Sequence, residues 1–331
     1  MYKCDHCQRD LLRDHLLGQA NDIAGLNARA CDATCIAAWE ASRPYKTTWT
    51  WRLISEWVAG WRLGSQPFYI QPPDDVPVWR YVDLAKVLDL IQTSELFLTA
   101  GHLLGDPYEG SLSEATLREF EQMAAAQALA VVGVAGPGYD VEAAKAKLFR
   151  MMRGNYEWER QWTYANCWHM NEHESAAMWA AYGSRQDAIA IRSSVARLRK
   201  CLEPHRHPPM GEPILAAVHY VDFGREAIKT DVHMAAMLHK RKSFVHECEV
   251  RILVRDLPLE GEPCAGGRRQ DMGREPVPGI RLAVDLTELV EEIYVSPHAP
   301  AWLLEALTGL VRKYGLAAPV RQSSLLEGAV F

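Results

Sequence analysis

Hydrophobic and polar positions change their period repeatedly after residue 77, and these changes mark alternating strands and helices. Residues 78–82, 95–100 and 163–170 are short runs rich in apolar, β-branched and aromatic side chains, which predicts strands. Residues 112–130 and 141–152 repeat apolar side chains at helical spacing and are joined by a turn rich in Gly and Pro. The other expected strands are 187–194, 214–223, 246–255, 280–286 and 291–296, and the other expected helices are 83–92, 174–183, 194–202, 235–244 and 300–315.

The order of these elements predicts the fold class. Strands that follow one another like hairpins are mixed with helices at irregular intervals, and no repeat is present. This order favours an α+β fold with a mixed or antiparallel sheet and flanking helices over a doubly wound parallel sheet. No glycine-rich loop follows a strand, so neither a P-loop nor a Rossmann phosphate site is expected. We expect this domain to cover residues 78–331.

A tryptophan-rich region precedes that domain. Residues 46–77 contain four tryptophans, and Trp57 and Trp61 share a helical face with Leu53. Such a stripe most often packs a helix onto a core, although the arginines beside the rings leave a stacking surface for nucleic acid open. The breakers in residues 71–77 predict a linker, so residues 46–77 are expected to connect two domains.

Four cysteines near the N-terminus give the strongest chemical signal. Cys4 and Cys7 are separated by two residues, and Cys31 and Cys35 by three, with the second pair at the start of a helical run. Thiolates at this spacing can share one tetrahedral zinc ion, and a helix N-terminus favours the thiolate form. The layout is similar to a treble-clef knuckle over residues 1–45, with a closed structural zinc site. Such a zinc would hold the fold or bind a partner, without taking part in catalysis.

Composition and charge narrow the class further. The chain has 331 residues, of which 48% are hydrophobic and 24% charged, which excludes a mainly disordered or fibrous protein. With 36 Lys and Arg against 42 Asp and Glu, the net charge of -6 does not indicate a protein that wraps nucleic acid. No apolar run is long enough to span a bilayer, and the polar N-terminus does not read as a signal peptide. We expect a cytoplasmic protein without a membrane partner.

Four stretches occur in an order typical of one bacterial family. These are Trp79-Arg80-Tyr81, the Gly-Asp-Pro-Tyr-Glu-Gly of residues 105–110, the Met-Trp-Ala-Ala-Tyr of residues 178–182, and the Glu-Cys-Glu-Val-Arg of residues 247–251. Over about residues 78–320 the chain resembles the family named domain of unknown function 2971. Position 105 is Gly where that family usually has Asn, and the cysteine knuckle is an addition. This resemblance implies no reaction.

The same plan is similar, at a distance, to the ADP-ribosyltransferase superfamily. There a first strand carries an Arg or His, a helix and a second strand follow, and a late strand supplies an acid, often as Glu-x-Glu. Arg80 or Tyr81 matches the first position, residues 167–169 the middle strand, and Glu247 and Glu249 the last. The resemblance implies a split sheet and NAD as substrate. The middle strand lacks the Ser-Thr-Ser found in some members.

The chemistry of NAD cleavage assigns roles to these residues. Breaking the nicotinamide–ribose bond passes through an oxocarbenium-like centre, which a carboxylate on the ribose hydroxyl stabilises, and Glu249 is expected to do so. Glu247, two residues earlier on the same strand face, is expected to orient the nucleophile. Arg80 can fork onto the pyrophosphate, and Trp179 or Tyr182 can stack on the nicotinamide.

The same alternation has a simpler interpretation. In an amphipathic strand the odd-numbered residues from Glu247 to Arg251 would face solvent, and the even-numbered residues from Cys248 to Ile252 would point inward. Both interpretations stay open at this level.

The loop after the strand at residues 95–100 also has two interpretations. Pro107 and Gly110 dictate a turn around residues 106–110. Loops that follow a strand often carry function, so Asp106 and Glu109 are alternatively expected to line the site and bind the cofactor.

A metal site is the competing chemical hypothesis. His169, Glu172 and His173 spell the H-x-x-E-H signature, in which two histidines on one helical face bind zinc and the glutamate activates water. Glu247 or Glu249 would be the third ligand. The context is against it, because His169 ends a strand-like run and the next helix is expected to start near Glu174.

Three functions therefore follow from the sequence. The first is an NAD-consuming ADP-ribosyltransferase-like enzyme, with a role in toxicity or phage defence, whose zinc knuckle recruits a macromolecular acceptor, either protein or nucleic acid. The second is a non-catalytic module in which the knuckle and the tryptophan-rich helix bind nucleic acid or protein. The third is a zinc peptidase.

Overall fold

The computed structural model describes most of the chain after residue 70. The described ranges are 71–132, 138–182, 186–205, 212–228, 234–260, 269–270 and 273–326, together with four two-residue strands before residue 29. Those strands pair antiparallel, β1 (Tyr2–Lys3) with β2 (Asp10–Leu11) and β3 (Ala20–Asn21) with β4 (Asn27–Ala28). The expected zinc ligands and the expected tryptophan-rich helix lie outside the described residues, so both stay predictions.

The chain divides into two compact units. One unit comprises residues 1–67, 120–151 and 258–274, and the other comprises residues 68–119, 152–257 and 275–331. In the first, β13 (Leu259–Glu260) pairs antiparallel with β14 (Arg269–Gln270). Helices α4 (Glu114–Ala130) and α5 (Val141–Gln161) each have residues in both units. The expected domain borders near residues 45 and 77 stay predictions.

A nine-stranded mixed sheet forms the second unit, which confirms the expected α+β class. The strand order is β15-β6-β7-β5-β8-β16-β17, with β12 on the remaining edge of β7 and β9 beyond it. Only β16 and β17 pair in parallel within this sheet. The strands are β5 (Pro77–Asp83), β6 (Glu95–Ala100), β7 (Thr163–Met170), β8 (Ala188–Ser194), β9 (Ile214–Ala217), β12 (Glu249–Arg255), β15 (Gly279–Ala283), β16 (Glu292–Val295) and β17 (Val320–Gln322).

The sheet splits along one edge of β7. The opposite edge of this strand pairs with β12 from Thr163 to His169. On the split edge, β6 pairs with β7 around Ala165, whereas β5 pairs with it at His169 and Met170. Because two strands share one edge of a third, β5 and β6 diverge from each other beyond these short pairings. The expected split sheet is therefore present.

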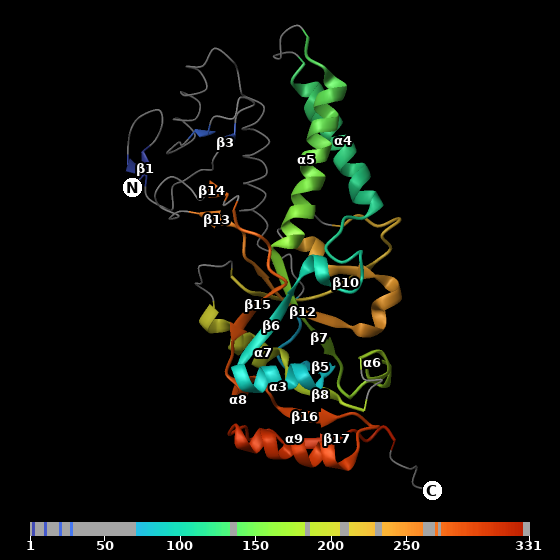
Figure 1. Ribbon diagram of the computed structural model, residues 1–331. Coiled ribbons are helices and arrows are strands. Elements are labelled where there is room, and N and C mark those ends of the chain that lie inside the picture. Colours follow the sequence, from blue (N-terminus) through green and yellow to red (C-terminus); the bar gives the residue numbers. More distant parts are fainter. Residues whose placement is uncertain are drawn as a thin grey trace. The chain divides into compact units, whose positions relative to one another are not determined.

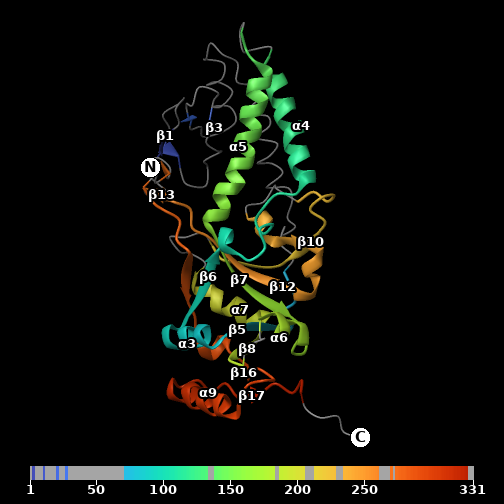
Figure 2. The same ribbon diagram turned by 45° about the vertical axis from the view of Figure 1, so that its right-hand side comes forward.

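Helices cover the two faces of the sheet unequally. The main core packs one face of the sheet against α3 (Leu84–Thr93), α7 (Val195–Leu202), α8 (Leu286–Leu289) and α9 (Ala301–Lys313). Figures 1 and 2 show α9 alongside β17. The other face carries α6 (Ala176–Tyr182) and the 3-10 turn η4 (Ala235–Leu238). This second face holds the polar site described below. No helix of the described ranges is long and apolar enough to cross a membrane.

The expected helix over residues 235–244 is wrong. This stretch folds as η4, the short strand β11 (His239–Arg241) and the 3-10 turn η5 (Lys242–Glu247). β11 pairs in parallel with β10 (His219–Val221), which with β9 replaces the single expected strand at 214–223. All of η4 is buried, and Lys240 makes ion pairs with distant acids, so tertiary contacts outweigh the local helical pattern.

Candidate functional site

The loop after β6 brings Glu109 to the site through a turn that Asp106 stabilises. Asp106 caps a turn by accepting hydrogen bonds from the backbone N–H groups of Tyr108 and Glu109, at 3.1 Å to its side chain and 3.0 Å to its carbonyl. Gly110 follows with φ of 70°, and a Cβ atom there would lie 2.5 Å from the sulfur of Met237. The turn interpretation is thus confirmed, and the turn directs the buried Glu109 toward the sheet.

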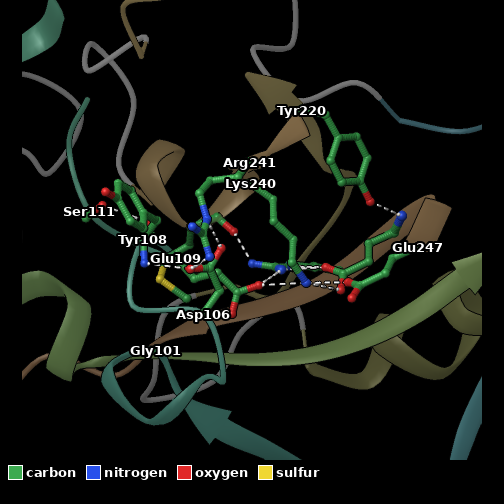
Figure 3. Close-up of polar contacts among 12 residues, drawn as sticks. Gly101, Asp106, Tyr108, Glu109, Ser111, Tyr220, Lys240, Arg241 and Glu247 are labelled. Carbon is green, nitrogen blue, oxygen red and sulfur yellow. Dashed lines mark hydrogen bonds and ion pairs between the residues drawn. The ribbon is translucent and has the colours of Figure 1, made fainter. Parts of the chain in front are cut away.

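Lys240 is the centre of a buried cluster of acids. Its ammonium lies 3.1 Å from Glu109 and 3.0 Å from Glu249, and it also pairs with Glu247. Figure 3 shows the lysine reaching between Glu109 and Glu247. All four residues are buried. Three carboxyl groups from three separate segments therefore share one cation.

Arg251 supplies the second cation. Its guanidinium is completely buried and lies 2.5 Å from both Glu109 and Glu249. It also donates a hydrogen bond of 2.9 Å to the carbonyl of Met237 in η4. A buried charge is stable only where it is paired and hydrogen-bonded, and Arg251 meets both conditions.

Glu247 and Glu249 converge by a different route from the expected one. Glu247 ends η5 rather than belonging to β12, and Cys248 between them adopts the left-handed conformation with φ of 37°. The two acids therefore do not share a strand face through simple alternation. The turn at Cys248 directs both side chains to Lys240 instead.

The simpler interpretation of this segment, a solvated strand face, is wrong. Glu247, Glu249 and Arg251 are 4%, 6% and 0% exposed, whereas Cys248 is the exposed residue. β12 is covered on both faces, because Val250, Ile252 and Val254 pack into the main core on one face and Leu253 packs against residues of η4 on the other.

Burial and pairing drive the pKa values of the two glutamates apart. Burial, together with a hydrogen bond to Glu249, raises the pKa of Glu247 to about 7 despite the opposing effect of Lys240. Burial would also raise the pKa of Glu249, but Arg251 and then Lys240 outweigh it, so that this pKa is lowered. Near neutral pH, Glu249 is thus an ionised carboxylate and Glu247 is poised to gain or lose a proton.

His169 lies directly behind Glu247. Its Nδ1–H donates a hydrogen bond of 2.6 Å to the carbonyl of Glu247, while its buried Nε2 has no hydrogen-bond partner among the described residues. Burial lowers the pKa of this imidazole, so the ring is neutral near pH 7. A neutral ring that donates through Nδ1 leaves Nε2 as an acceptor.

Aromatic side chains form a wall next to this histidine. Tyr81 contacts Trp179 edge to face, with ring centroids 5.0 Å apart, and its ring centroid lies 6.2 Å from that of His169. Tyr182, at the end of α6, is 49% exposed and its hydroxyl donates to Glu247 at 3.4 Å. Three of the expected ligand-binding residues therefore gather near the glutamates.

Two other expected ligand-binding residues, Arg80 and Asp106, lie outside the acid cluster, whereas Glu109 belongs to it. Arg80 alternates with Trp79 and Tyr81 along β5, so it projects to the opposite face of the sheet. It lines a cavity to which neither glutamate contributes. Asp106 binds Arg241 bidentately, at 3.0 and 2.9 Å, rather than joining the acid cluster. The expected pocket that combines Arg80 with the two acids is corrected accordingly.

The helical metal signature is also corrected. His169 lies in β7, His173 follows on an exposed turn, and α6 begins only at Ala176, so the two histidines share no helical face. Within the described ranges, no group of three or more His, Cys, Asp or Glu side chains is placed to hold a metal ion.

Lys240 and Tyr220 are the site residues that the sequence pattern missed. Lys240 falls in the stretch expected to be helical, and Tyr220 accepts a hydrogen bond of 2.9 Å from the backbone N–H of Glu249. The only available signal was a run of three basic residues, 240–242, shortly before Glu-Cys-Glu.

Two structures of one protein match the chain, both at low sequence identity. No family model and no curated protein matches the chain, so the resemblance to domain of unknown function 2971 stays a prediction. Among solved structures, the chain is similar to DarT from Thermus sp. 2.9 in complex with NAD+, at 10% identity and a TM-score of 0.33. The same protein in complex with carba-NAD+ matches at 9% identity and a TM-score of 0.32. Each match covers 76% of this chain and 96% of the DarT chain.

Proposed function

We propose that this chain is an ADP-ribosyltransferase-like enzyme that breaks the bond between nicotinamide and ribose in NAD and transfers the ADP-ribose to an acceptor. The observation that carries the proposal is the buried carboxyl pair. Glu249 is held ionised by Arg251 and Lys240, and the neighbouring Glu247 has a pKa of about 7. Two carboxyl groups whose surroundings drive their pKa values apart are the arrangement that cleavage of a glycosidic bond requires.

The charge of the cluster suits the reaction. With Glu247 ionised, the three carboxylates outnumber Lys240 and Arg251 by one, so the cluster carries a net negative charge. The bond to nicotinamide breaks with its electron pair remaining on the departing ring nitrogen, which leaves a positive centre at the ribose carbon. A fixed negative charge in a buried site stabilises that centre.

Glu247 is the group placed to handle the proton. The acceptor's oxygen or nitrogen forms the new bond to the ribose carbon and releases its proton, which the Glu247 carboxylate takes up. A general base works best when its pKa lies near the operating pH, and Glu247 meets this condition. Glu249 serves as the permanent charge, and its backbone is held by Tyr220.

The surrounding rings give the nicotinamide a binding surface. Tyr182 offers a half-exposed ring whose hydroxyl already contacts Glu247, and Trp179 and Tyr81 lie in contact with each other close by. Flat aromatic faces stack on a heteroaromatic ring. An acceptor would be recruited by residues 1–45, most of which lie outside the described part of the chain.

The test is release of nicotinamide from NAD labelled in the nicotinamide ring. We expect the full chain to release it, and Glu247→Gln to slow release by about 100-fold or more, as expected for loss of a general base. Glu157→Gln is the matched control, because Glu157 is an exposed acid that pairs with Arg153 on α5. Absence of release by the wild-type chain, or an unchanged rate in folded Glu247→Gln, would refute the proposal.

A further inference from the structure

A second site lies where the sheet splits. A cavity of about 480 Å³ is bounded by β5, the start of α3, β6 and β15. Its apolar walls include Val82, Leu90, Phe97 and Ile191, and Thr99 adds a hydroxyl. The volume falls within the range of small-molecule sites in proteins, about 300–1,000 Å³. None of the residues of the acid cluster lines it.

Most charges around this cavity cancel in pairs. Lys86 lies 2.8 Å from Asp83, its partner at the N-cap of α3. Arg281 forms a two-pronged ion pair with Asp89, at 2.9 Å for each nitrogen, and lies 3.6 Å from Glu95. These five side chains contain two cations and three acids, so Arg80 is the one cation of the lining that is not already paired with an acid among the described residues.

Arg80 is the exception, because its guanidinium has no hydrogen bond or ion pair with any described residue. The side chain is half-buried, and the partial loss of water around it lowers its pKa to about 10, with an opposing effect from the Cys167 thiol. Partial removal of a guanidinium from water costs free energy, and its five N–H donors have no protein acceptor among the described residues. Such a group is stable where a ligand supplies the missing acceptors.

We propose that this cavity binds a small molecule with one anionic group and an aromatic or apolar body. A planar carboxylate or a phosphate would accept two parallel hydrogen bonds from Arg80, which is the geometry that a guanidinium prefers. The body of the ligand would lie against Phe97, Leu90 and Ile191. A neutral ligand of the same shape would leave the half-buried guanidinium without an anionic partner, so the site discriminates by charge.

Benzoate and benzyl alcohol provide a matched test, since they differ mainly in the carboxylate. Isothermal titration of the full chain should detect benzoate binding, with benzyl alcohol at least about tenfold weaker. Arg80→Met, which keeps the apolar stem, should weaken benzoate binding by at least about tenfold. Arg153→Met should keep it within about twofold, because Arg153 lies on the exposed surface of α5, paired with Glu157, and does not line the cavity.

The outcomes are decisive in either direction. Failure of the wild-type chain to bind benzoate, equal affinity for the two compounds, or unchanged benzoate affinity in Arg80→Met would overturn the proposal. If Arg80→Met does not fold, as judged by its circular dichroism, Arg80→Lys replaces it. This variant keeps the charge but loses the fork, so benzoate should bind more weakly than to wild type and still better than benzyl alcohol.

Discussion

Glu247 should make the protein less stable as the pH rises from about 5 to 8. Its pKa is raised from the usual 4.5 to about 7 in the folded chain, because it is buried and hydrogen-bonded to Glu249. Between these two values the folded state holds a proton that the unfolded state has released, so the free energy of unfolding falls as pH increases. At about 1.4 kcal/mol per pH unit, the interval corresponds to a loss of about 3 kcal/mol.

Urea unfolding of wild type and Glu247→Gln at pH 5 and pH 8 measures this loss. A neutral glutamine cannot titrate, so the variant should resemble wild type at pH 5 and become more stable than it by about 3 kcal/mol at pH 8. His169 titrates in the same window with the opposite sign, since its pKa is lowered, but it contributes equally to both proteins. The difference between them therefore isolates Glu247.

The change with pH of the stability difference between wild type and Glu247→Gln shows whether the pKa of Glu247 is raised. Glu157→Gln, on the exposed surface of α5, should differ from wild type by the same small amount at both pH values. A difference for Glu247→Gln that does not change with pH would show that Glu247 titrates normally. A variant that becomes less stable at pH 8 would show that the pairing of ionised Glu247 with Lys240 outweighs the cost of its burial.

Three further substitutions test other parts of the site. Arg251→Met should cost about 3–5 kcal/mol in urea titrations, because Glu109 and Glu249 stay buried without their shared cation; a cost below about 1 kcal/mol would contradict this. Cys248→Gly should stabilise the chain by about 1 kcal/mol in the same assay, since glycine adopts φ of 37° without strain, and a loss would reject that reasoning. Tyr182→Ala should raise KM for NAD about tenfold while Tyr182→Phe stays within about twofold, because the half-exposed ring provides the contact; equal effects would implicate the hydroxyl instead.

Strands of the sheet interior were predictable because their signal is local. Residues 95–100 and 163–170 are short runs rich in apolar and aromatic side chains, and both form strands with the expected bounds. The stretch at 235–244 was not predictable, since its helical pattern is outweighed by pairing with β10 and by ion pairs from Lys240. β17 has only three residues and pairs with β16 alone, so it gives too short a pattern to read.

The candidate site was predictable only as far as its acids. Glu-x-Glu marked Glu247 and Glu249, and the turn at 106–110 marked Glu109. The sequence contains no signal that Cys248 is left-handed, although this conformation turns the two acids toward one lysine. It also could not show which face of the sheet holds the acids, so the alternation along β5 did not decide whether Arg80 or Tyr81 lies on their side.

The unequal pairing within the cluster explains why the pKa values of Glu247 and Glu249 are shifted in opposite directions. Glu109 and Glu249 each contact both Lys240 and Arg251, so their charges are compensated twice. Glu247 contacts only Lys240, which it shares with those two acids. In a buried group the least compensated carboxylate is the one that takes up a proton, and here it is also the one beside the half-exposed Tyr182. The same imbalance that would weaken the fold at high pH therefore places a titrating group beside an exposed aromatic side chain.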